Sequence, residues 1–403
     1  MRPLLLGLVM VAQLGSAQDL LIEKVTIINP ASETPLQIAS IYIKNGAIEA
    51  VERKPRVPKG VKRIDASGKF ALPGLWDMHA HLAALFPIGI APEHYVGHGV
   101  LHVRDMGGHL EELLPLRDSI QRRLRVGPTI LLAGPTLNGE APADFHRQVS
   151  TEAEARQAVR ELKAAGVDFI KIHRATNREA FYAIADECKK QGLTFSGHVP
   201  LVLSWIEAAQ AGMHTIEHIQ TIYENLQPDP KKVSLEFIRM SLQLEGTLGD
   251  SIFSVLKERH TYFDPTLIGY QESFASASPE LAERRKSAFQ KMKRVAFRAY
   301  QAGVPIITGT DVLRNHGQLL HEELLLLESI GIPRKDVLTA ATLTSAQAAQ
   351  HPELGMIKPG SPASFIILTE NPLLDLNHLR NPEMVIMKGN VLSKEELERL
   401  RKR

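Results

Sequence analysis

The middle of the chain alternates short apolar runs with amphipathic helical stretches, and this rhythm limits the choice of fold more than any other feature. Several apolar runs follow a helical stretch that ends in a glycine turn, as at Gly166 and Gly192. Such repeated βα units predict a parallel sheet. Eight runs are strand candidates: residues 72–78, 100–106, 129–133, 169–173, 194–199, 215–219, 262–267 and 306–310. Eight units over residues 73–350 predict a TIM (β/α)8 barrel, whose active site lies at the carboxyl ends of the strands.

Both ends of the chain show a different pattern, in which apolar runs alternate with turn signals. Asn45-Gly46 joins two apolar stretches near the start, and Asn-Gly in this setting is a strong hairpin signal. A similar pattern returns near the end, where Lys388-Gly389 separates two short apolar runs. We therefore expect residues 18–72 and 351–403 to form one small β-sandwich domain beside the α/β barrel.

The first residues are typical of a secretory signal peptide. Arg2 precedes an apolar run at residues 4–11, and small residues follow at positions 15–17. The run is too short to span a bilayer as a mature helix, although an uncleaved membrane anchor stays an alternative. We expect residues 1–17 to be removed, the mature protein to be periplasmic or secreted, and no stable membrane association after cleavage.

Charge and cysteine content narrow the function further. The chain carries 47 basic and 45 acidic residues, a formal net charge of +2, without a long block of Lys and Arg. Nucleic-acid binding is therefore not expected. Cys188 is the only cysteine, which excludes an internal disulfide and a cysteine-based metal cluster and leaves His and carboxylate side chains as metal ligands. The expected partner is a small-molecule substrate, and formation of a homo-oligomer stays open.

Ligand-type side chains from five predicted strands lie at the same strand end: His79, His81, Lys171, His198, His218 and Asp311. The two-residue spacing of His79 and His81 puts both imidazoles on one face of an extended segment. The same alternation turns Lys171 toward the barrel axis, with Ile170 and Ile172 toward the helices. Each residue alone has a plain structural explanation, such as a loop histidine or a lysine whose amine reaches out of the core. Their common placement favours one site.

Several stretches of the chain resemble the amidohydrolase superfamily, in particular its imidazolonepropionase-like and prolidase-like members. Residues 71–81 (ALPGLWDMHAH) are similar to the family's first-strand motif, and residues 103–108 (VRDMGG) are similar to its second strand. Residues 358–360 (KPG) and 371–373 (NPL) are similar to the strands that return to the family's β-sandwich. The resemblance covers nearly all of the chain after residue 17, and it implies a binuclear metal-dependent hydrolase that acts on carbon–nitrogen bonds.

The resemblance also assigns metal ligands, position by position. His79 and His81 match the pair that binds the more buried metal. Lys171 matches the lysine whose carbamate, formed with CO2, bridges two metals. His198 and His218 match the ligands of the more exposed metal. Two divalent ions are therefore implied, with Zn2+ as the default for a site of this composition, while Mn, Co and Fe also fit.

Asp311 matches the strand-eight aspartate of the same family, which is both a metal ligand and the catalytic acid–base group. The resemblance implies that a metal-bridging hydroxide attacks the carbonyl carbon of the substrate. Asp311 then takes the proton of the nucleophile and transfers it to the leaving group.

The residues after His198 argue against two related reactions. Deaminases of the superfamily usually carry a glutamate three residues after this histidine, where this chain has Leu201, and they normally lack the bridging lysine. Deamination and imidazolonepropionate opening are therefore disfavoured. We expect a dipeptidase or prolidase-like enzyme, or an N-acyl amino acid hydrolase. The alternatives are an esterase, lactonase or organophosphate-type hydrolase and, from another class, a catalytically inactive barrel that serves as a binding protein.

Three further residues are candidates for substrate binding. His146, in the loop after the third strand, is a candidate contact for the substrate carbonyl, and a plain loop histidine explains it equally well. Arg174 follows the fourth strand and can pair with a substrate carboxylate or with an acid of a neighbouring loop. Tyr223 lies five residues after His218, whereas prolidase-like relatives tend to place a tyrosine nearer.

Overall fold

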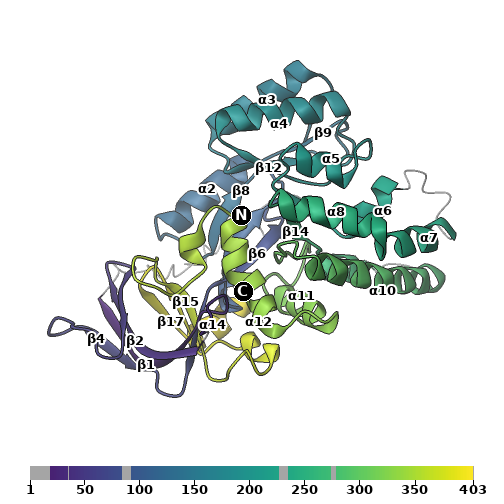
Figure 1. The fold of residues 1–403 in the computed structure, drawn as a ribbon. Coiled ribbons are helices and arrows are strands. Elements are labelled where there is room, and N and C mark those ends of the chain that lie inside the picture. The colour runs from purple at the N-terminus through teal and green to yellow at the C-terminus, as the bar shows by residue number, and fades with distance from the viewer. Residues whose placement is uncertain (1–18, 35, 84–91, 227–234, 274–277, 403) are drawn as a thin grey trace, which may run out of the picture.

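The computed structural model describes residues 19–34, 36–83, 92–226, 235–273 and 278–402 (Figure 1). The expected signal peptide, residues 1–17, lies outside the described residues. Within the described ranges, no helix has both the length and the apolar character that a membrane crossing requires.

Strands and helices alternate over most of the described chain. The strands are β1 (Leu20–Ile28), β2 (Leu36–Lys44), β3 (Ala47–Glu52), β4 (Lys62–Asp65), β5 (Phe70–Pro73), β6 (Leu75–Ala80), β7 (Val100–Asp105), β8 (Thr129–Leu132), β9 (Thr136–Asn138), β10 (His146–Gln148), β11 (Phe169–Ile172), β12 (Thr194–Gly197), β13 (Thr215–Glu217), β14 (Tyr262–Asp264), β15 (Ser364–Leu368), β16 (Met384–Met387) and β17 (Asn390–Ser393). The helices are α1 (Glu93–Gly97), α2 (Leu110–Gln121), α3 (Glu152–Ala165), α4 (Arg178–Gln191), α5 (Trp205–Gln210), α6 (Gln220–Leu226), α7 (Leu235–Leu244), α8 (Thr247–Glu258), α9 (Leu267–Glu272), α10 (Pro279–Gln301), α11 (Gln318–Ser329), α12 (Arg334–Thr339), α13 (Ser345–Ala348) and α14 (Lys394–Arg401). A π-helix, η2 (Ala340–Thr344), and two 3₁₀ helices, η3 (Pro352–Leu354) and η4 (Leu376–Arg380), complete the set.

The middle of the chain forms two parallel sheets, in the strand orders β6-β7-β8 and β10-β9-β11-β12-β13-β14. Backbone contacts join the two sheets on both sides. The Asp168 N–H donates to the Leu132 carbonyl at 2.9 Å, while Phe263 of β14 forms a parallel bridge with Ile306. The segment after Ile306 is hydrogen-bonded to β6, because the Met78 N–H donates to the Thr308 carbonyl at 2.8 Å. The fold is therefore TIM-barrel-like and α/β.

Three of the predicted strands differ clearly from the observed ones. The strand expected over residues 262–267 ends at Asp264, and Leu267 begins helix α9. The strand expected over residues 72–78 is divided at Gly74 into β5, which joins the sheet of the chain ends, and β6. A Cβ at Gly74 would lie 2.7 Å from the Leu101 Cβ, so the close approach of these two segments requires glycine. The strand expected over residues 306–310 contains a single β-bridge, at Ile306.

Local signals at the helix ends fix the βα rhythm. Helix α3 begins with a capping box, in which Thr151 accepts a hydrogen bond from the Glu154 N–H and Glu154 accepts one from the Thr151 N–H. It ends at Gly166 in the left-handed conformation, with φ of 88°. Helix α4 begins at the Asn177 cap and ends at Gly192 in the same conformation. The predicted glycine turns are thus confirmed at both helices.

Strands from both ends of the chain form one sheet in the order β17-β16-β15-β5-β1-β2-β3, with β4 paired to β1. The predicted hairpins are confirmed: Asn45 and Gly46 have φ of 51° and 81° between β2 and β3, and Lys388 and Gly389 have 48° and 83° between β16 and β17. Positive φ at both positions is typical of the type I′ turn. That these strands pack face to face as a β-sandwich stays a prediction.

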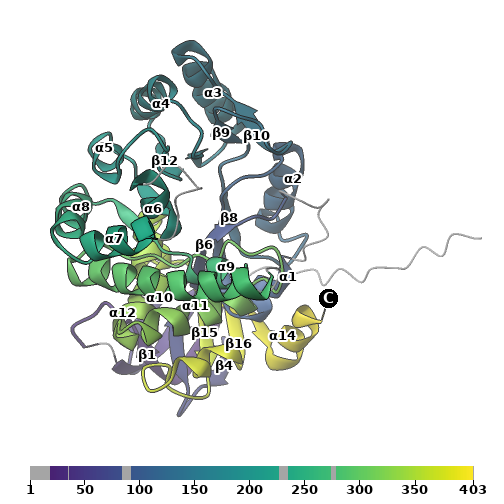
Figure 2. The ribbon, with the colours of Figure 1, turned by 90° about the vertical axis from the view of Figure 1, so that its right-hand side faces the viewer.

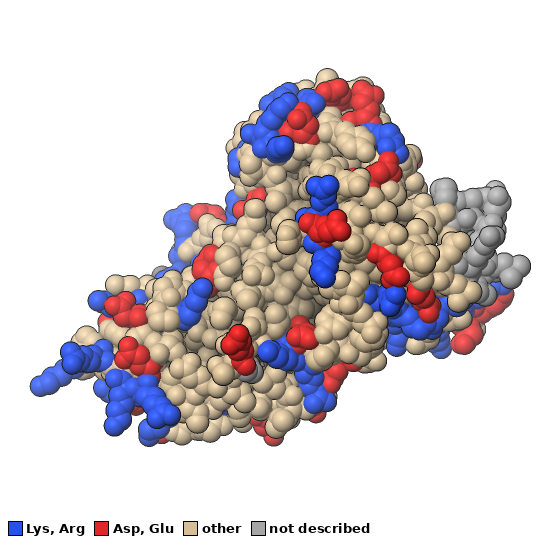
Figure 3. Space-filling model, viewed as in Figure 1, with Lys and Arg blue, Asp and Glu red and all other residues tan. Residues whose placement is uncertain are grey.

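The sheet of the chain ends lies at the opposite end of the molecule from α3 and α4 (Figures 1 and 2). The last helix, α14, contacts the barrel, because the Arg401 guanidinium donates to the Gly97 carbonyl of α1 at 2.6 Å. On the face drawn in Figure 3, basic and acidic side chains are interspersed. Many exposed charges of the described residues form ion pairs, each of which contributes little to stability.

Candidate active site

All six predicted ligand residues lie at the carboxyl ends of parallel strands, or just beyond them. His79 is in β6 and His81 follows it, Lys171 is in β11, His198 follows β12, His218 follows β13, and Asp311 follows the segment bridged at Ile306. The structure brings these side chains together. Their roles as metal ligands stay predictions.

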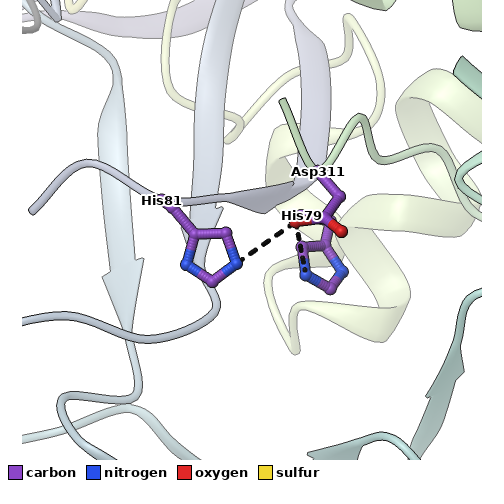
Figure 4. Close-up of side chains that lie close together, drawn as sticks. All are labelled: His79, His81 and Asp311. Atoms are coloured by element: carbon purple, nitrogen blue, oxygen red, sulfur yellow. Dashed lines mark ion pairs between the residues drawn. The ribbon is translucent and has the colours of Figure 1, made fainter. Parts of the chain in front are cut away.

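Asp311 contacts three of the predicted histidines, two of which, His79 and His81, are drawn with it in Figure 4. Its Oδ1 lies 3.6 Å from His79 Nε2 and 3.3 Å from His81 Nε2, and its Oδ2 lies 3.7 Å from His218 Nδ1. The Asp311 N–H also donates to the His79 carbonyl at 2.8 Å. Asp311 and His218 have φ of 51° and 68°. Non-glycine residues adopt this region at a cost, and such strain is common at functional sites.

The histidine rings contact one another around Asp311. The ring centroids of His79 and His218 are 4.5 Å apart, as are those of His198 and His218, and those of His79 and His81 are 5.3 Å apart. One ligand atom from each of His79, His81 and Asp311 lies within 4.8 Å of the other two, which is the spacing of a metal site.

Lys171 supplies a buried amine without a partner. Its side chain is 2% exposed, and among the described residues its Nζ has no hydrogen-bond partner. Gly197 makes room for the lysine chain, since a Cβ there would lie 2.8 Å from the Lys171 Cδ. Burial lowers the pKa of Lys171 to about 8, against the opposing charges of Glu217 and Asp311. A neutral amine is therefore readily reached, and this is the form that reacts with CO2.

A buried network fixes the orientation of His79. Its Nδ1 lies 3.2 Å from Glu217 Oε2, and Glu217 is paired with the Arg104 guanidinium at 2.8 Å. Arg104 also donates to the Met78 carbonyl at 2.8 Å and to Thr215 Oγ1 at 3.0 Å. With Nδ1 donating to Glu217, His79 presents Nε2 as the free acceptor. The His79, Glu217 and Asp264 atoms are also closely spaced, but Glu217 is already paired with Arg104.

Similar contacts orient two more of the histidines. His81 Nδ1 donates to the Gly107 carbonyl at 3.0 Å, so its Nε2 points to Asp311. His218 Nδ1 lies 2.8 Å from Thr266 Oγ1. Sequence reasoning missed Gly107, Thr266 and the network above. The signal that could have revealed the network is the presence of charged residues, Arg104 and Glu217, inside apolar strands.

Burial keeps three of the histidines neutral, whereas the pKa of His81 is raised, because its hydrogen bond to Asp311 and the charge of Asp311 together outweigh burial. Burial lowers the pKa of His79 and His198 well below the ordinary value and that of His218 to about 4, so these imidazoles are neutral near pH 7. Burial alone would raise the pKa of Asp311, but the His81 hydrogen bond and the nearby positive charges hold it below its usual range. Neutral imidazoles and an ionised carboxylate are the donor forms that bind a divalent cation.

The three predicted substrate-binding residues have different surroundings. His146 is half-buried near the site, with its ring 5.1 Å from the ring of His173. Arg174 is exposed at the same rim and forms no close ion pair within the described ranges, although its charge partly offsets the rise that burial causes in the pKa of Glu224. Tyr223 is buried in the core, where its hydroxyl contacts Ser241 in α7. The structure therefore does not bring Tyr223 to the group of predicted ligands, because α6 turns it toward the neighbouring helix.

Comparison with known proteins is consistent with this geometry. The model of the Amidohydrolase family matches residues 70–392, which is most of the chain. This chain belongs to the amidohydrolase family. The amidohydrolase is accordingly a hydrolase that acts on carbon–nitrogen bonds, and members of the family usually bind metal ions.

Individual relatives cover almost the whole amidohydrolase. Ochratoxinase from Aspergillus niger is 24% identical over 443 aligned residues, which cover 92% of this chain and 87% of ochratoxinase. A candidate prolidase from Bifidobacterium longum superposes with a TM-score of 0.78 at 23% identity, covering 96% of this chain and 98% of that one. An Xaa-Pro dipeptidase with methionine bound in its active site gives a TM-score of 0.74 at 23% identity, with 93% and 100% covered. These structures share the TIM-barrel-like fold.

Proposed function

We propose that this amidohydrolase is a binuclear metal-dependent hydrolase that cleaves an amide or peptide bond in a small substrate with a free carboxylate. The observation that carries the proposal is the convergence of four histidines and Asp311 around the buried, unpartnered Lys171 amine. A structural lysine at this depth would need an ion pair or hydrogen bonds, because burying an unpaired charge is costly.

The donor set fits two divalent ions, for which Zn2+ is the first choice. In the proposal, His79 and His81 would hold one ion, His198 and His218 would hold the other, and Lys171 would be a further ligand as a carbamate. Asp311 completes the set. When bound, such ions supply Lewis-acid polarisation of a carbonyl and lower the pKa of a water.

Carbamylation is proposed for Lys171 because the amine is both buried and easily neutralised. The nitrogen lone pair forms a bond to the carbon of CO2, and one proton leaves the nitrogen for solvent. The product is an anionic carbamate with two oxygens. Carbamylation therefore replaces the lysine amine, which has no hydrogen-bond partner among the described residues, with an anionic group whose oxygens can bind metal ions.

Asp311 is proposed to move the proton during catalysis. Its pKa is lowered, so the partly exposed carboxylate is ionised near pH 7, and it lies 3.3 Å from His81 Nε2, so it can accept a proton from the nucleophile. It then donates that proton to the nitrogen of the leaving group. Arg174 is proposed to bind the substrate carboxylate, since it is exposed at the rim and forms no close ion pair among the described residues, with Glu224 as the acid that its charge reaches.

The substrate is proposed to be a dipeptide, of the Xaa-Pro type or another, or an N-acyl amino acid. The names of the relatives support this choice, since one is an Xaa-Pro dipeptidase and another is ochratoxinase. The signal-peptide pattern at residues 1–17 supports a periplasmic or secreted location. We propose further that the parallel strands close as a (β/α)8 barrel and that the chain ends form a β-sandwich.

Metal content tests the proposal directly. The protein would be produced from residue 18 with bicarbonate and trace metals, and metals per chain measured by mass spectrometry of the ions. We expect two ions per chain, a large loss in Lys171→Ala, and no loss in Lys163→Ala, which removes an exposed lysine of α3. A carbamate signal in NMR with ¹³C-bicarbonate should vanish in Lys171→Ala only. One ion per chain that persists without Lys171 would refute the binuclear site.

A further inference from the structure

Aromatic rings form a closed circuit around the candidate active site. Successive ring centroids are 5.3 Å apart for His79–His81, 6.3 Å for His81–Phe145, 4.7 Å for Phe145–His146, 5.1 Å for His146–His173, 4.2 Å for His173–His198, 4.5 Å for His198–His218 and 4.5 Å for His218–His79. Four of these rings belong to the predicted metal ligands. The other three, from Phe145, His146 and His173, have no part in that set.

These three rings are held in place by the backbone of β9. His146 pairs with Thr136 in the parallel ladder of β10 and β9, and the His173 N–H donates to the Leu137 carbonyl at 3.0 Å. All three rings are half-buried. They are therefore fixed in position while part of each surface stays accessible, which is the arrangement of a binding wall.

The wall lies beside the proposed carboxylate-binding group. Arg174 directly follows His173 and is exposed. In addition, His173 Nδ1 is buried without a hydrogen-bond partner among the described residues, so a purely structural role leaves this polar atom unexplained. His173 and Arg174 are adjacent in the chain, so the ring and the proposed carboxylate-binding residue belong to the same segment after β11.

We propose that Phe145, His146 and His173 form a specificity wall that selects a substrate whose carboxylate-bearing residue has a flat, aromatic side chain. This inference rests on the proposed amide hydrolase function and names its substrate class. Aromatic rings prefer offset-stacked or edge-to-face contacts, and one such pair strengthens binding about 2- to 12-fold beyond the effect of buried area. An aliphatic side chain of the same size gains only the affinity that comes from burying apolar area.

The test compares two substrates that differ only in aromaticity: glycyl-phenylalanine and glycyl-cyclohexylalanine. For the metal-loaded wild type we expect kcat/KM to favour the aromatic substrate about 2- to 12-fold. His173→Leu should bring this ratio close to one, whereas His173→Phe, which keeps a ring, should preserve it. His351→Leu, which removes a surface histidine away from the rim, is the matched control.

Two further readouts separate this inference from the proposed function. Metal content should be unchanged in His173→Leu, and its loss would overturn the wall in favour of a role in supporting the metals. If the wild type cleaves neither of these peptides, nor any Xaa-Pro dipeptide or N-acyl amino acid, the proposed function fails, and calorimetry then compares the binding of free phenylalanine and cyclohexylalanine. A preference for phenylalanine that disappears in His173→Leu would still support the wall. An unchanged substrate ratio in His173→Leu, or equal binding of both amino acids, would overturn it.

Discussion

Replacing Arg104 with methionine should destabilise this amidohydrolase strongly. The Arg104 side chain is 3% exposed and donates hydrogen bonds to Met78, Thr215 and Glu217. Methionine keeps an unbranched side chain but leaves the fully buried Glu217 carboxylate without its cation. Breaking a buried ion pair in this way costs about 3–5 kcal/mol. We therefore expect urea titration to show a fall of about 3–5 kcal/mol in the free energy of unfolding.

A second ion pair in the same protein provides the control. Arg63 and Glu23 are 2.9 Å apart, nearly the same distance as Arg104 and Glu217, but their side chains are 53% and 31% exposed. Arg63→Met should cost about 0–1 kcal/mol, because water screens and solvates the remaining charge. The difference in the free energy of unfolding between the two variants measures how much burial increases the cost of breaking an Arg–Glu ion pair.

The buried pair also has a functional consequence. Glu217 orients His79, so Arg104→Met should weaken metal binding about 10- to 100-fold, measured by competition with a chelator. Adding Glu217→Gln to Arg104→Met should recover part of the stability, because it removes the unpaired charge. Equal losses of stability in Arg104→Met and Arg63→Met, or no recovery in the double variant, would refute this reasoning.

Three other changes have defined outcomes. Gly197→Ala would put a Cβ 2.2 Å from the Ile172 carbonyl oxygen at φ of 131°, so we expect large losses of stability and metal content. The control is Gly60→Ala, where φ is 85° and the space is open, and it should lower the free energy of unfolding by only about 1 kcal/mol in urea titration. Burial lowers the pKa of His102 to about 3 from an ordinary 6.5, so the unfolded chain takes up the proton first as pH falls. This contribution to stability is complete above pH 6.5 and is lost by about 1.4 kcal/mol per pH unit between 6.5 and 3, and His102→Gln should remove it from urea titrations at several pH values. Asp311→Asn should abolish turnover while the circular dichroism spectrum stays native, and retained turnover would exclude the proposed proton transfer.

Much of the fold could be predicted from local patterns. The turn at Asn45-Gly46 and the helix ends at Gly166 and Gly192 depend on residues close in sequence, and all three were found there. The grouping of Lys171 with histidines of other strands also followed from strand alternation. A parallel sheet brings the same end of every strand together, so position along each strand was enough.

Other features depend on contacts that the sequence pattern does not encode. The division of the first barrel strand at Gly74 follows from the close approach of Leu101. The pairing of Arg104 with Glu217 joins β7 to β13, which are not neighbouring strands. Tyr223 was a candidate at the rim only because it follows His218 closely, and the turn into α6 directs it to Ser241 in the core.

The sheet of the chain ends has a consequence for the order of folding. Strand β5 pairs with β1 on one edge and with β15 on the other, and all of the βα units lie between β5 and β15 in sequence. During synthesis the second edge of β5 therefore stays open until the ribosome has released the final strands. Such non-local pairing slows folding and prolongs exposure of an unpaired strand edge. Because Gly74 alone separates β5 from β6, this late pairing adjoins the strand that carries His79.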